Sequence, residues 1–121
     1  MYKNLCYSPL VCHQAVTGLE IVDTPRSTEG LIHALDSSQK AVRERSVKAL
    51  AERAADEDSP SRERAIEGLI HALDNSEYKV RREAILALHG IDTARAREGV
   101  KKALNNSDER IRRLAREAMK N

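Results

Sequence analysis

The sequence predicts an all-α protein, a right-handed α-solenoid (α-α superhelix) of about three and a half antiparallel helix pairs in a single domain, residues 1–121. Residues 29–36 (EGLIHALD) recur without change as residues 67–74, and such a copy indicates a repeat architecture. Apolar or small residues recur at steps 4, 7 and 8 after Val42 and Val80, which is one stripe of a helical period. A single helix cannot bury that stripe, so neighbouring copies must stack. The composition, 40% hydrophobic and 33% charged without Trp or Phe, suits helices around an aliphatic core.

The first unit along the chain is a partial repeat at residues 1–22, because residues 11–30 align with residues 80–99. The first helix of a complete unit is missing there, so one apolar surface is left without its usual cover. The apolar residues of this N-terminal face are Leu5, Leu10 and Val11. We therefore predict that the face either forms a homodimer or is covered by residues 1–8.

Three further units of two helices each are predicted at about residues 25–55, 60–91 and 93–120. The short first helix of each unit is expected to end near an acidic or amide residue, which is Asp36, Asp74 or Asn105. The second helix should begin after a serine whose hydroxyl can accept a hydrogen bond from a first-turn amide. These serines are Ser38, Ser76 and Ser107.

Seven extra residues separate the first two of these units, because their copies are 38 positions apart whereas the next two are 31 apart. The extra residues fall within residues 54–64, and seven residues correspond to about two helical turns. Ser59 followed by Pro60 is a further helix-start pattern in this segment. The segment therefore predicts a longer pair of helices joined at an acidic corner, formed by Asp56, Glu57 and Asp58.

The repeated pattern resembles the HEAT-like repeats named after phycobilisome lyases. The resemblance rests on the Leu-Ile-x-Ala-Leu of the first helices and on the Val-Arg that opens the second helices, and it covers about residues 9–120. It implies HEAT-like helix pairs joined by a ladder of arginines and turn residues. The arginines of this ladder would be Arg43, Arg81 and Arg112. Their partners would be Asp36, Asp74 or neighbouring residues. Cys12 stands at the arginine position of the partial repeat, so the ladder should stop before the N-terminus.

A partner-binding face is predicted on the second helices. Residues 2, 6 and 9 steps after the first stripe residue point away from the core stripe. In solenoids of this type the second helices line one broad face that is used for binding. The residues expected there are Glu44, Lys48, Arg82, Leu86, His89, Arg113 and Glu117. Leu86 is the best single candidate because it is an apolar residue among charged ones, and the alternative is a charged surface that contacts only solvent.

No metal site, cofactor site or catalytic site is predicted. His33 and His71 occupy matching places, but neighbouring helices lie about 10 Å apart and no Cys or carboxylate shares their spacing. Cys6, Cys12 and His13 lack the Cys-x-x-Cys spacing of a metal site. The sequence contains no Gly-x-Ser-x-Gly, phosphate-binding glycine loop or His-Glu-x-x-His. We therefore expect that the protein is not an enzyme.

The sequence favours a non-catalytic scaffold that binds a protein partner. One alternative is nucleic-acid binding through the basic C-terminal repeat, whose cations are Lys101, Lys102, Arg110, Arg112, Arg113 and Arg116. The small net charge of +2 and the lack of Trp and Phe weigh against it. A second alternative, implied by the resemblance alone, is a bilin lyase-type accessory protein, although the sequence offers no evident pigment pocket.

The remaining features concern location and the ends of the stack. The sequence has neither a signal-peptide pattern nor an apolar run of about 18 residues, so we expect a cytoplasmic protein that does not span a membrane. Two cysteines do not form a disulfide framework. Arg116 stands where earlier units carry Val47 and Ile85, which predicts that the C-terminal unit is a polar cap.

Overall fold

The computed structural model describes residues 23–120, and this range contains six α-helices and no β-strand. The helices are α2 (Pro25–Ala34), α3 (Lys40–Ala55), α4 (Arg62–Ala72), α5 (Tyr78–His89), α6 (Ala94–Ala103) and α7 (Glu109–Lys120). The predicted partial repeat at residues 1–22, with Cys6, Cys12, His13 and the predicted homodimer face, lies outside the described residues. The predicted all-α repeat fold is confirmed.

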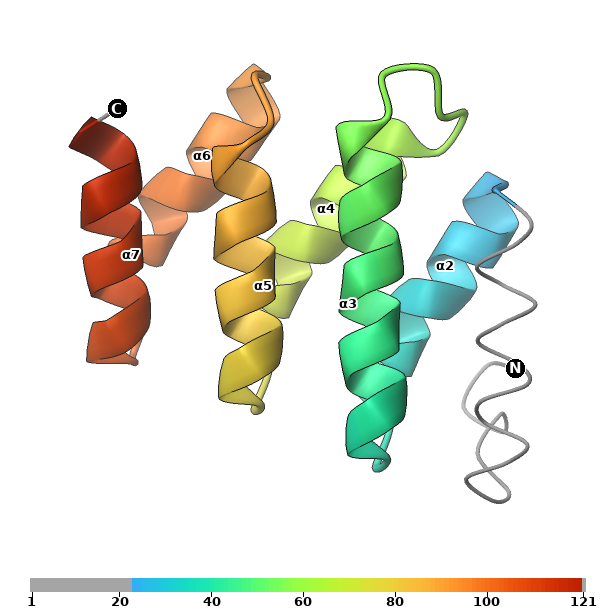
Figure 1. The fold of residues 1–121 in the computed structure, drawn as a ribbon, viewed down its shortest axis with the longest axis horizontal. Coiled ribbons are helices and arrows are strands. Elements are labelled where there is room, and N and C mark those ends of the chain that lie inside the picture. The colour runs from blue at the N-terminus through green and yellow to red at the C-terminus, as the bar shows by residue number, and fades with distance from the viewer. Residues whose placement is uncertain (1–22, 121) are drawn as a thin grey trace.

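The helices form two layers (Figure 1). The first helices of the three pairs, α2, α4 and α6, make one layer, and the second helices, α3, α5 and α7, make the layer nearer the viewer. Each helix packs against its partner in the same pair and against the next helix in its own layer. Among the described residues, no further layer packs on the outer side of the second helices.

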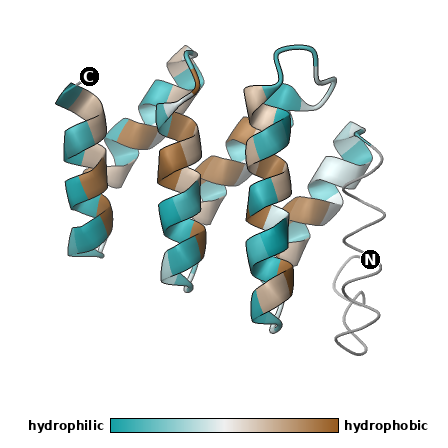
Figure 2. Ribbon diagram, in the orientation of Figure 1, coloured by the Kyte–Doolittle hydropathy of each residue, from teal (hydrophilic) through white to brown (hydrophobic). Residues whose placement is uncertain are grey.

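The predicted apolar stripe lies in the core. The residues that begin it are at most 1% exposed: Val42, Val80 and Ile111. Figure 2 shows that the outward side of the second helices is mainly hydrophilic, with the hydrophobic residues turned toward the other layer and toward neighbouring helices. Met119 is an exception at 52% exposed, whereas Leu50 and Leu88 occupy the same position in earlier units and are buried by the pair that follows.

A glycine in α4 and another in α6 let adjacent first helices approach closely. A Cβ atom added to Gly68 would lie 2.7 Å from Cγ1 of Ile32, and one added to Gly99 would lie 2.7 Å from Cγ1 of Ile70. Carbon atoms pack best at about 3.5–4.0 Å, so a larger residue would push the first helices apart. This contact is a physical reason for the glycine at this position in α4 and α6.

The second helices do not begin as predicted. Helices α3 and α5 start after Gln39 and Glu77, and neither N-cap residue makes a side-chain capping bond. Helix α7 starts after Asp108, whose Oδ1 accepts a hydrogen bond from the backbone N–H of Arg110 at 2.9 Å. The prediction of serine caps at Ser38, Ser76 and Ser107 is therefore wrong, because each helix begins one residue later than the serine would require.

The first helices begin at threonine or serine. Thr24 accepts a hydrogen bond from the N–H of Ser27 at 3.1 Å, and Thr93 accepts one from the N–H of Ala96 at 3.1 Å. Each threonine thus satisfies a backbone donor that the first turn leaves unpaired. Helix α4 starts after Ser61. The helix start expected at Ser59 and Pro60 is therefore displaced by two residues.

The seven extra residues between the first two units are divided among three elements. Helix α3 has 16 residues against 12 in α5, and α4 has 11 against 10 in α6. The loop at residues 56–61 supplies the other two, because the corresponding loop covers only residues 90–93. The acidic residues of the predicted corner are exposed in the longer loop, namely Asp56, Glu57 and Asp58.

Candidate interaction surface

An arginine bridges each pair of consecutive units. Arg43 donates from Nη1 to a backbone carbonyl in the turn of its own unit at 2.7 Å, and from Nη2 to Oε2 of Glu77 at 2.9 Å. Arg81 repeats this arrangement, with a carbonyl at 2.6 Å and Oδ2 of Asp108 at 2.7 Å. The arginine and acid side chains are 14–23% exposed. Each pair thus joins the second helix of one unit to the start of the second helix in the next.

Asp36 and Asp74 are not the acids of this ladder, but their neighbours Ser37 and Asn75 supply the turn carbonyls that accept from Arg43 and Arg81, as the prediction allowed. Asp36 is exposed, and Oδ2 of Asp74 lies 3.5 Å from Nζ of Lys102 on the surface. The acids that bind the arginines are Glu77 and Asp108, at the start of the next second helix. A carboxylate at that place also faces the positive end of the helix dipole. The acid of the ladder therefore lies at the start of the second helix and not at the end of the first.

The third arginine, Arg112, makes only part of the same pattern. Its Nη1 donates to the carbonyl of Asn106 at 2.6 Å, as the turn carbonyls are used in the earlier units. Its Nη2 donates to Oε2 of Glu109, in its own helix, at 2.6 Å. Arg112 thus keeps the contact within its unit and replaces the contact between units with a local ion pair.

Two asparagines make a second contact between units, which the sequence analysis did not assign. Asn75 Nδ2 donates to the carbonyl of Leu35 at 2.8 Å, and Asn106 Nδ2 donates to the carbonyl of Leu73 at 2.8 Å. Each carbonyl lies at the end of a first helix, where backbone acceptors lack helical partners. The matching repeat positions of the two asparagines were visible in the sequence, but they do not indicate which carbonyl each amide reaches.

The exposed side of the first helices carries a row of ion pairs. Arg64 Nη2 donates to Oε1 of Glu29 at 2.7 Å. Arg95 bonds both carboxylate oxygens of Glu67 and also Oε2 of Glu98 at 3.0 Å. Hydrogen bonds from Arg64 and Arg95 hold the pKa values of Glu29 and Glu67 below their ordinary range. The chain itself therefore neutralises most of the charge on this side.

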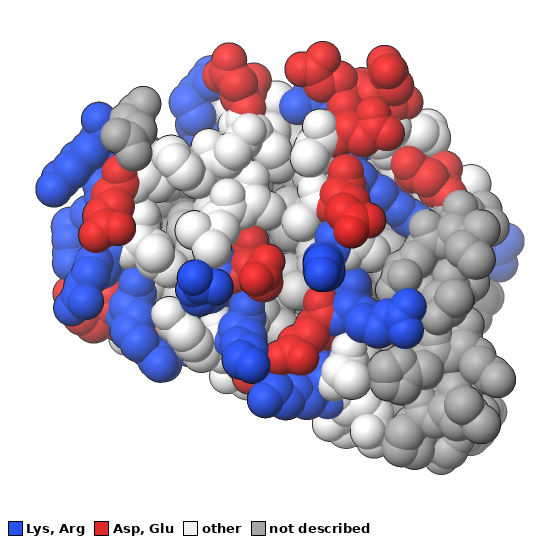
Figure 3. All heavy atoms as spheres, viewed as in Figure 1, with Lys and Arg blue, Asp and Glu red and all other residues white. Residues whose placement is uncertain are grey.

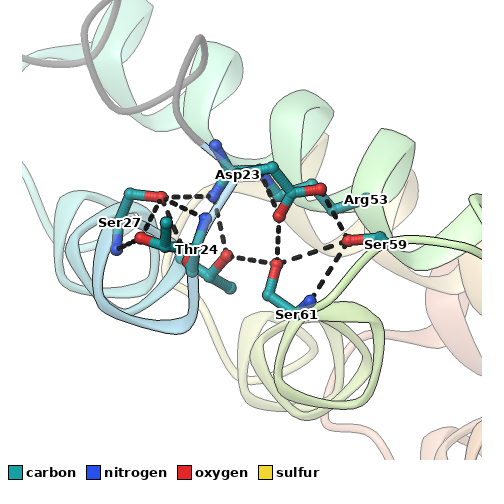
Figure 4. Close-up of polar contacts among 7 residues, drawn as sticks. Asp23, Thr24, Ser27, Arg53, Ser59 and Ser61 are labelled. Carbon is teal, nitrogen blue, oxygen red and sulfur yellow. Dashed lines mark hydrogen bonds and ion pairs between the residues drawn. The ribbon is translucent and has the colours of Figure 1, made fainter.

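A buried polar network joins α2 to the longer connection between α3 and α4 (Figure 4). Arg53 is 5% exposed, its Nη1 donates to Oγ1 of Thr28 at 2.7 Å, and its Nε lies 3.7 Å from Oδ1 of Asp23. Ser59 and Ser61 each donate to one oxygen of Asp23. Burial raises the pKa of Asp23, but hydrogen bonds from the two serines and the charge of Arg53 outweigh it and hold that pKa below its usual value. The network therefore holds the connection between α3 and α4 against the start of α2.

The outer side of the second helices differs in that most of the charged side chains predicted for the partner-binding face form no ion pair among the described residues. Leu86 is 42% exposed on α5. The exposed side chains predicted to accompany it form no ion pair within residues 23–120, and they are Lys48, Arg82, His89, Arg113 and Glu117. Glu44 is the exception, since it is half-buried and its Oε1 lies 3.8 Å from Nζ of Lys79. Figure 3 shows charges of both signs interspersed on this side of the molecule.

Residues 28–120 match the model of a family described as HEAT repeats. The chain belongs to the HEAT repeat family. Its fold is also similar to that of a chain from the complex of CpcE and CpcF of phycocyanin lyase from Nostoc sp. PCC7120, with a TM-score of 0.64 and 19% sequence identity. That match covers 97% of this chain and 76% of the other. Comparison with curated proteins gave no match. The predicted resemblance to lyase-type HEAT repeats is confirmed, and at this identity it concerns the fold alone.

Most cations of the last HEAT unit are paired within the chain. Their ion pairs are Arg110 with Asp108, Arg112 and Arg116 with Glu109, and Lys102 with Asp74. Hydrogen bonds from Arg116 and Arg112 hold the pKa of Glu109 below its usual range. In the described part of the chain, Lys101 and Arg113 are the two cations of the predicted basic set that form no ion pair. This pairing reduces the positive charge available for phosphates.

The histidines of the first HEAT helices lie on the surface. His33 and His71 are exposed on α2 and α4, and Nε2 of His33 lies 3.8 Å from Oε1 of Glu29. Within residues 23–120 there is no group of three His, Cys, Asp or Glu side chains placed to hold a metal ion. None of the described helices has the length and apolar character required to cross a bilayer.

Proposed function

We propose that this HEAT repeat protein is a non-catalytic, cytoplasmic scaffold that binds a protein partner on the outer face of α3, α5 and α7. One contrast carries the proposal. The arginines between repeats are paired with acids of the chain, whereas Lys48, Arg82 and Arg113 on this face form no ion pair with another residue of the range 23–120. Unpaired charges beside an exposed apolar side chain, here Leu86, are what a polar interface with an apolar anchor requires.

A protein partner suits this face better than a nucleic acid does. The face carries charges of both signs, while binding to phosphates needs a positive surface (Figure 3). Binding of single strands also needs aromatic stacking residues. In the described residues the aromatic side chain is Tyr78, and Cζ of Arg110 already lies 3.7 Å from its ring centroid. The fold similarity to a chain that forms a complex with another protein also supports a protein partner.

The double substitution Arg82→Glu with Leu86→Ala tests the proposal. Partners cross-linked to the wild-type protein in cell extract are identified by mass spectrometry, and the affinity of each is then titrated. We expect the double variant to weaken binding by about tenfold or more, because an anchor and its flanking charge are both lost. The control is Glu63→Lys with His71→Glu on the exposed side of α4, which should bind as the wild type does. Equal binding by both double variants would reject this face.

A bilin lyase-type accessory protein is the second candidate, and it rests on the similarity to a chain of the phycocyanin lyase complex. In that case the partner would be part of the apparatus that handles a linear tetrapyrrole. Titration with a linear tetrapyrrole, followed by absorbance, tests this candidate directly. A shifted and intensified absorption band would support it, and an unchanged spectrum at saturating protein would reject it.

A further inference from the structure

The last helix pair presents a surface that the next pair covers in the earlier units. We call it the end face, and it consists of Lys101 of α6 with Arg112, Arg116 and Met119 of α7. Where the end face has Lys101, the earlier units carry Ile32 and Ile70, which pack against the glycine of the following unit. Where it has Arg116, they carry a Val or Ile that is at most 1% exposed. Cations therefore replace two apolar contacts between repeats.

An open groove of about 570 Å³ lies between the end of α5, α6 and α7, and Lys101 is the end-face cation that lines it. Its apolar lining is Leu88, Ile91, Ala94, Val100, Ala118 and Met119. The acids at its rim are already paired, Asp92 with Arg97 at 2.6 Å and Glu98 with Arg95 at 3.0 Å. Met119 is 52% exposed, and its flexible side chain can adapt to the shape of a bound group. The groove can therefore receive an apolar side chain from outside.

The end face carries more cations than acids, although the groove itself is lined by two cations, Arg97 and Lys101, and two acids, Asp92 and Glu98. Residues 98–121 carry seven Lys and Arg against four Asp and Glu. Arg112 and Arg116 share one acid, Glu109, at 2.6 and 2.9 Å, and Lys101 forms no ion pair among the described residues. Arg112, Arg116 and Met119 lie on one side of α7, because they are spaced by four and three residues. Figure 3 shows the basic side chains gathered at this end of the molecule.

We propose that the end face docks an acidic, amphipathic α-helix of another protein. An apolar side chain of that helix enters the groove beside Met119, and its carboxylates bind Lys101, Arg112 and Arg116. Carboxylates are the ligands that the equivalent ladder arginines, Arg43 and Arg81, already bind between units. This contact is separate from the face of α3, α5 and α7 and does not depend on it.

Two other occupants fit the end face less well. A HEAT unit with the apolar contacts found between the earlier units would bury Lys101 and Arg116 without partners, and burial of an unpaired charge is costly. A nucleic acid would leave the apolar groove unfilled. An acidic helix supplies an apolar side chain for the groove, a carboxylate for Lys101 and further carboxylates for Arg112 and Arg116, which otherwise share Glu109.

The probe for this proposal is a fluorescent peptide of Ala, Leu and Glu, longer than about 15 residues so that it is helical in water. Leu and Glu share one face of the peptide, and a control peptide has Gln in place of every Glu. Anisotropy at low salt measures binding to the 121-residue chain. The test variant is Lys101→Glu with Arg116→Glu, and the matched control is Lys48→Glu with Arg82→Glu on the second-helix face. Circular dichroism verifies that both variants are folded, and Gln replaces Glu in any variant that is not.

We expect the acidic peptide to bind the wild type and the Lys48 and Arg82 variant equally. The Lys101 and Arg116 variant should bind about tenfold or more weakly, because like charges then face each other. The Gln peptide should also bind weakly. The proposal is overturned if the acidic peptide does not bind, if Lys48 and Arg82 are the residues that matter, or if a DNA duplex binds the end face more tightly. It is also overturned if sedimentation shows a dimer that the Lys101 and Arg116 variant abolishes.

Discussion

Replacement of Gly68 by Ala should destabilise the protein, although Ala is the better helix former. The added Cβ would lie 2.7 Å from Cγ1 of Ile32 and 3.4 Å from Cδ1 of Leu50. Carbon contacts are most favourable from about 3.5 Å, so α2 and α4 must separate by up to about 0.8 Å or Ile32 must leave its rotamer. Overpacking of this kind costs about 1–3 kcal/mol, and the gain in helix propensity offsets only about 1 kcal/mol of it.

Gly90→Ala is the matched control for this substitution. Gly90 ends α5 with φ −80° and ψ −5°, a conformation that Ala adopts without strain. The nearest atom to an added Cβ is the carbonyl oxygen of Ala87, at 3.6 Å. This variant should therefore gain about 0.4–1 kcal/mol by restricting the unfolded chain. The chemical change is the same at both sites, so a difference of about 1–3 kcal/mol in the free energy of unfolding isolates the cost of the close contact.

Urea denaturation followed by far-UV circular dichroism measures both free energies. A double-mutant cycle with Ile32→Ala adds a second test, because that substitution removes the atoms that clash. We expect a coupling energy of about 0.5 kcal/mol or more, with the double variant less destabilised than the sum of the single ones. If Gly68→Ala were as stable as Gly90→Ala, or showed no coupling to Ile32→Ala, the close approach of α2 and α4 would be refuted.

Three further predictions concern the stability of the folded chain, the first two measured by urea denaturation and the third by the melting temperature. Substitution of Arg43 and Glu77 by Ala, singly and together, should give a coupling energy of about 1 kcal/mol, since the pair is only partly exposed; no coupling would remove the ladder as a stabilising contact. Asn75→Ala should cost about 1–3 kcal/mol because it leaves a buried carbonyl unpaired, whereas exposed Asn105→Ala should change stability by less than about 0.5 kcal/mol. Hydrogen bonds from Arg95 lower the pKa of Glu67 in the folded protein. The ionised Glu67 therefore stabilises the folded state above its unfolded pKa of about 4.3, and this contribution is lost as the pH falls through the pKa of the folded state. The melting temperature should therefore fall on acidification below about pH 4, and Glu67→Gln should reduce that fall; an unchanged slope would contradict the assignment.

The fold could be predicted from the sequence because the signal for it is local and repeated. The stripe that begins at Val42, Val80 and Ile111 fixes which side of each second helix is buried, and an exact copy of eight residues shows that the units are equivalent. The role of the recurrent glycine could not be predicted in the same way. It depends on the distance between Gly68 and Ile32, which belong to different units and have no shared pattern in the sequence.

The partners of the ladder arginines could not be predicted because they depend on where each helix begins. A shift of three residues, from Asp74 to Glu77, separates an acid on the surface from one at the start of a helix. Once the first residue of each second helix is known, the sequence shows which residues occupy the ladder positions in the other units. Gln39 occupies the place of the ladder acid in the first described unit, and Cys12 occupies the place of the arginine in the sequence of the unit before. Both partners of the ladder pair are thus replaced at the same junction. This is expected for an ion pair, because either charge alone would be left unpaired.

The net charge of +2 gives little information about function because the charges of this protein form two groups. Each contact between repeats uses one cation and one acid, so these pairs cancel however many units are stacked. Among the charges that remain, those on the outer face of α3, α5 and α7 and on the end face lie on the two proposed binding surfaces. Side chains there contribute little to folding, and substitutions at such sites usually change stability by less than about 0.5 kcal/mol. Charge reversal on either surface should therefore change which partner binds without unfolding the chain, which makes these surfaces the positions where binding specificity can vary.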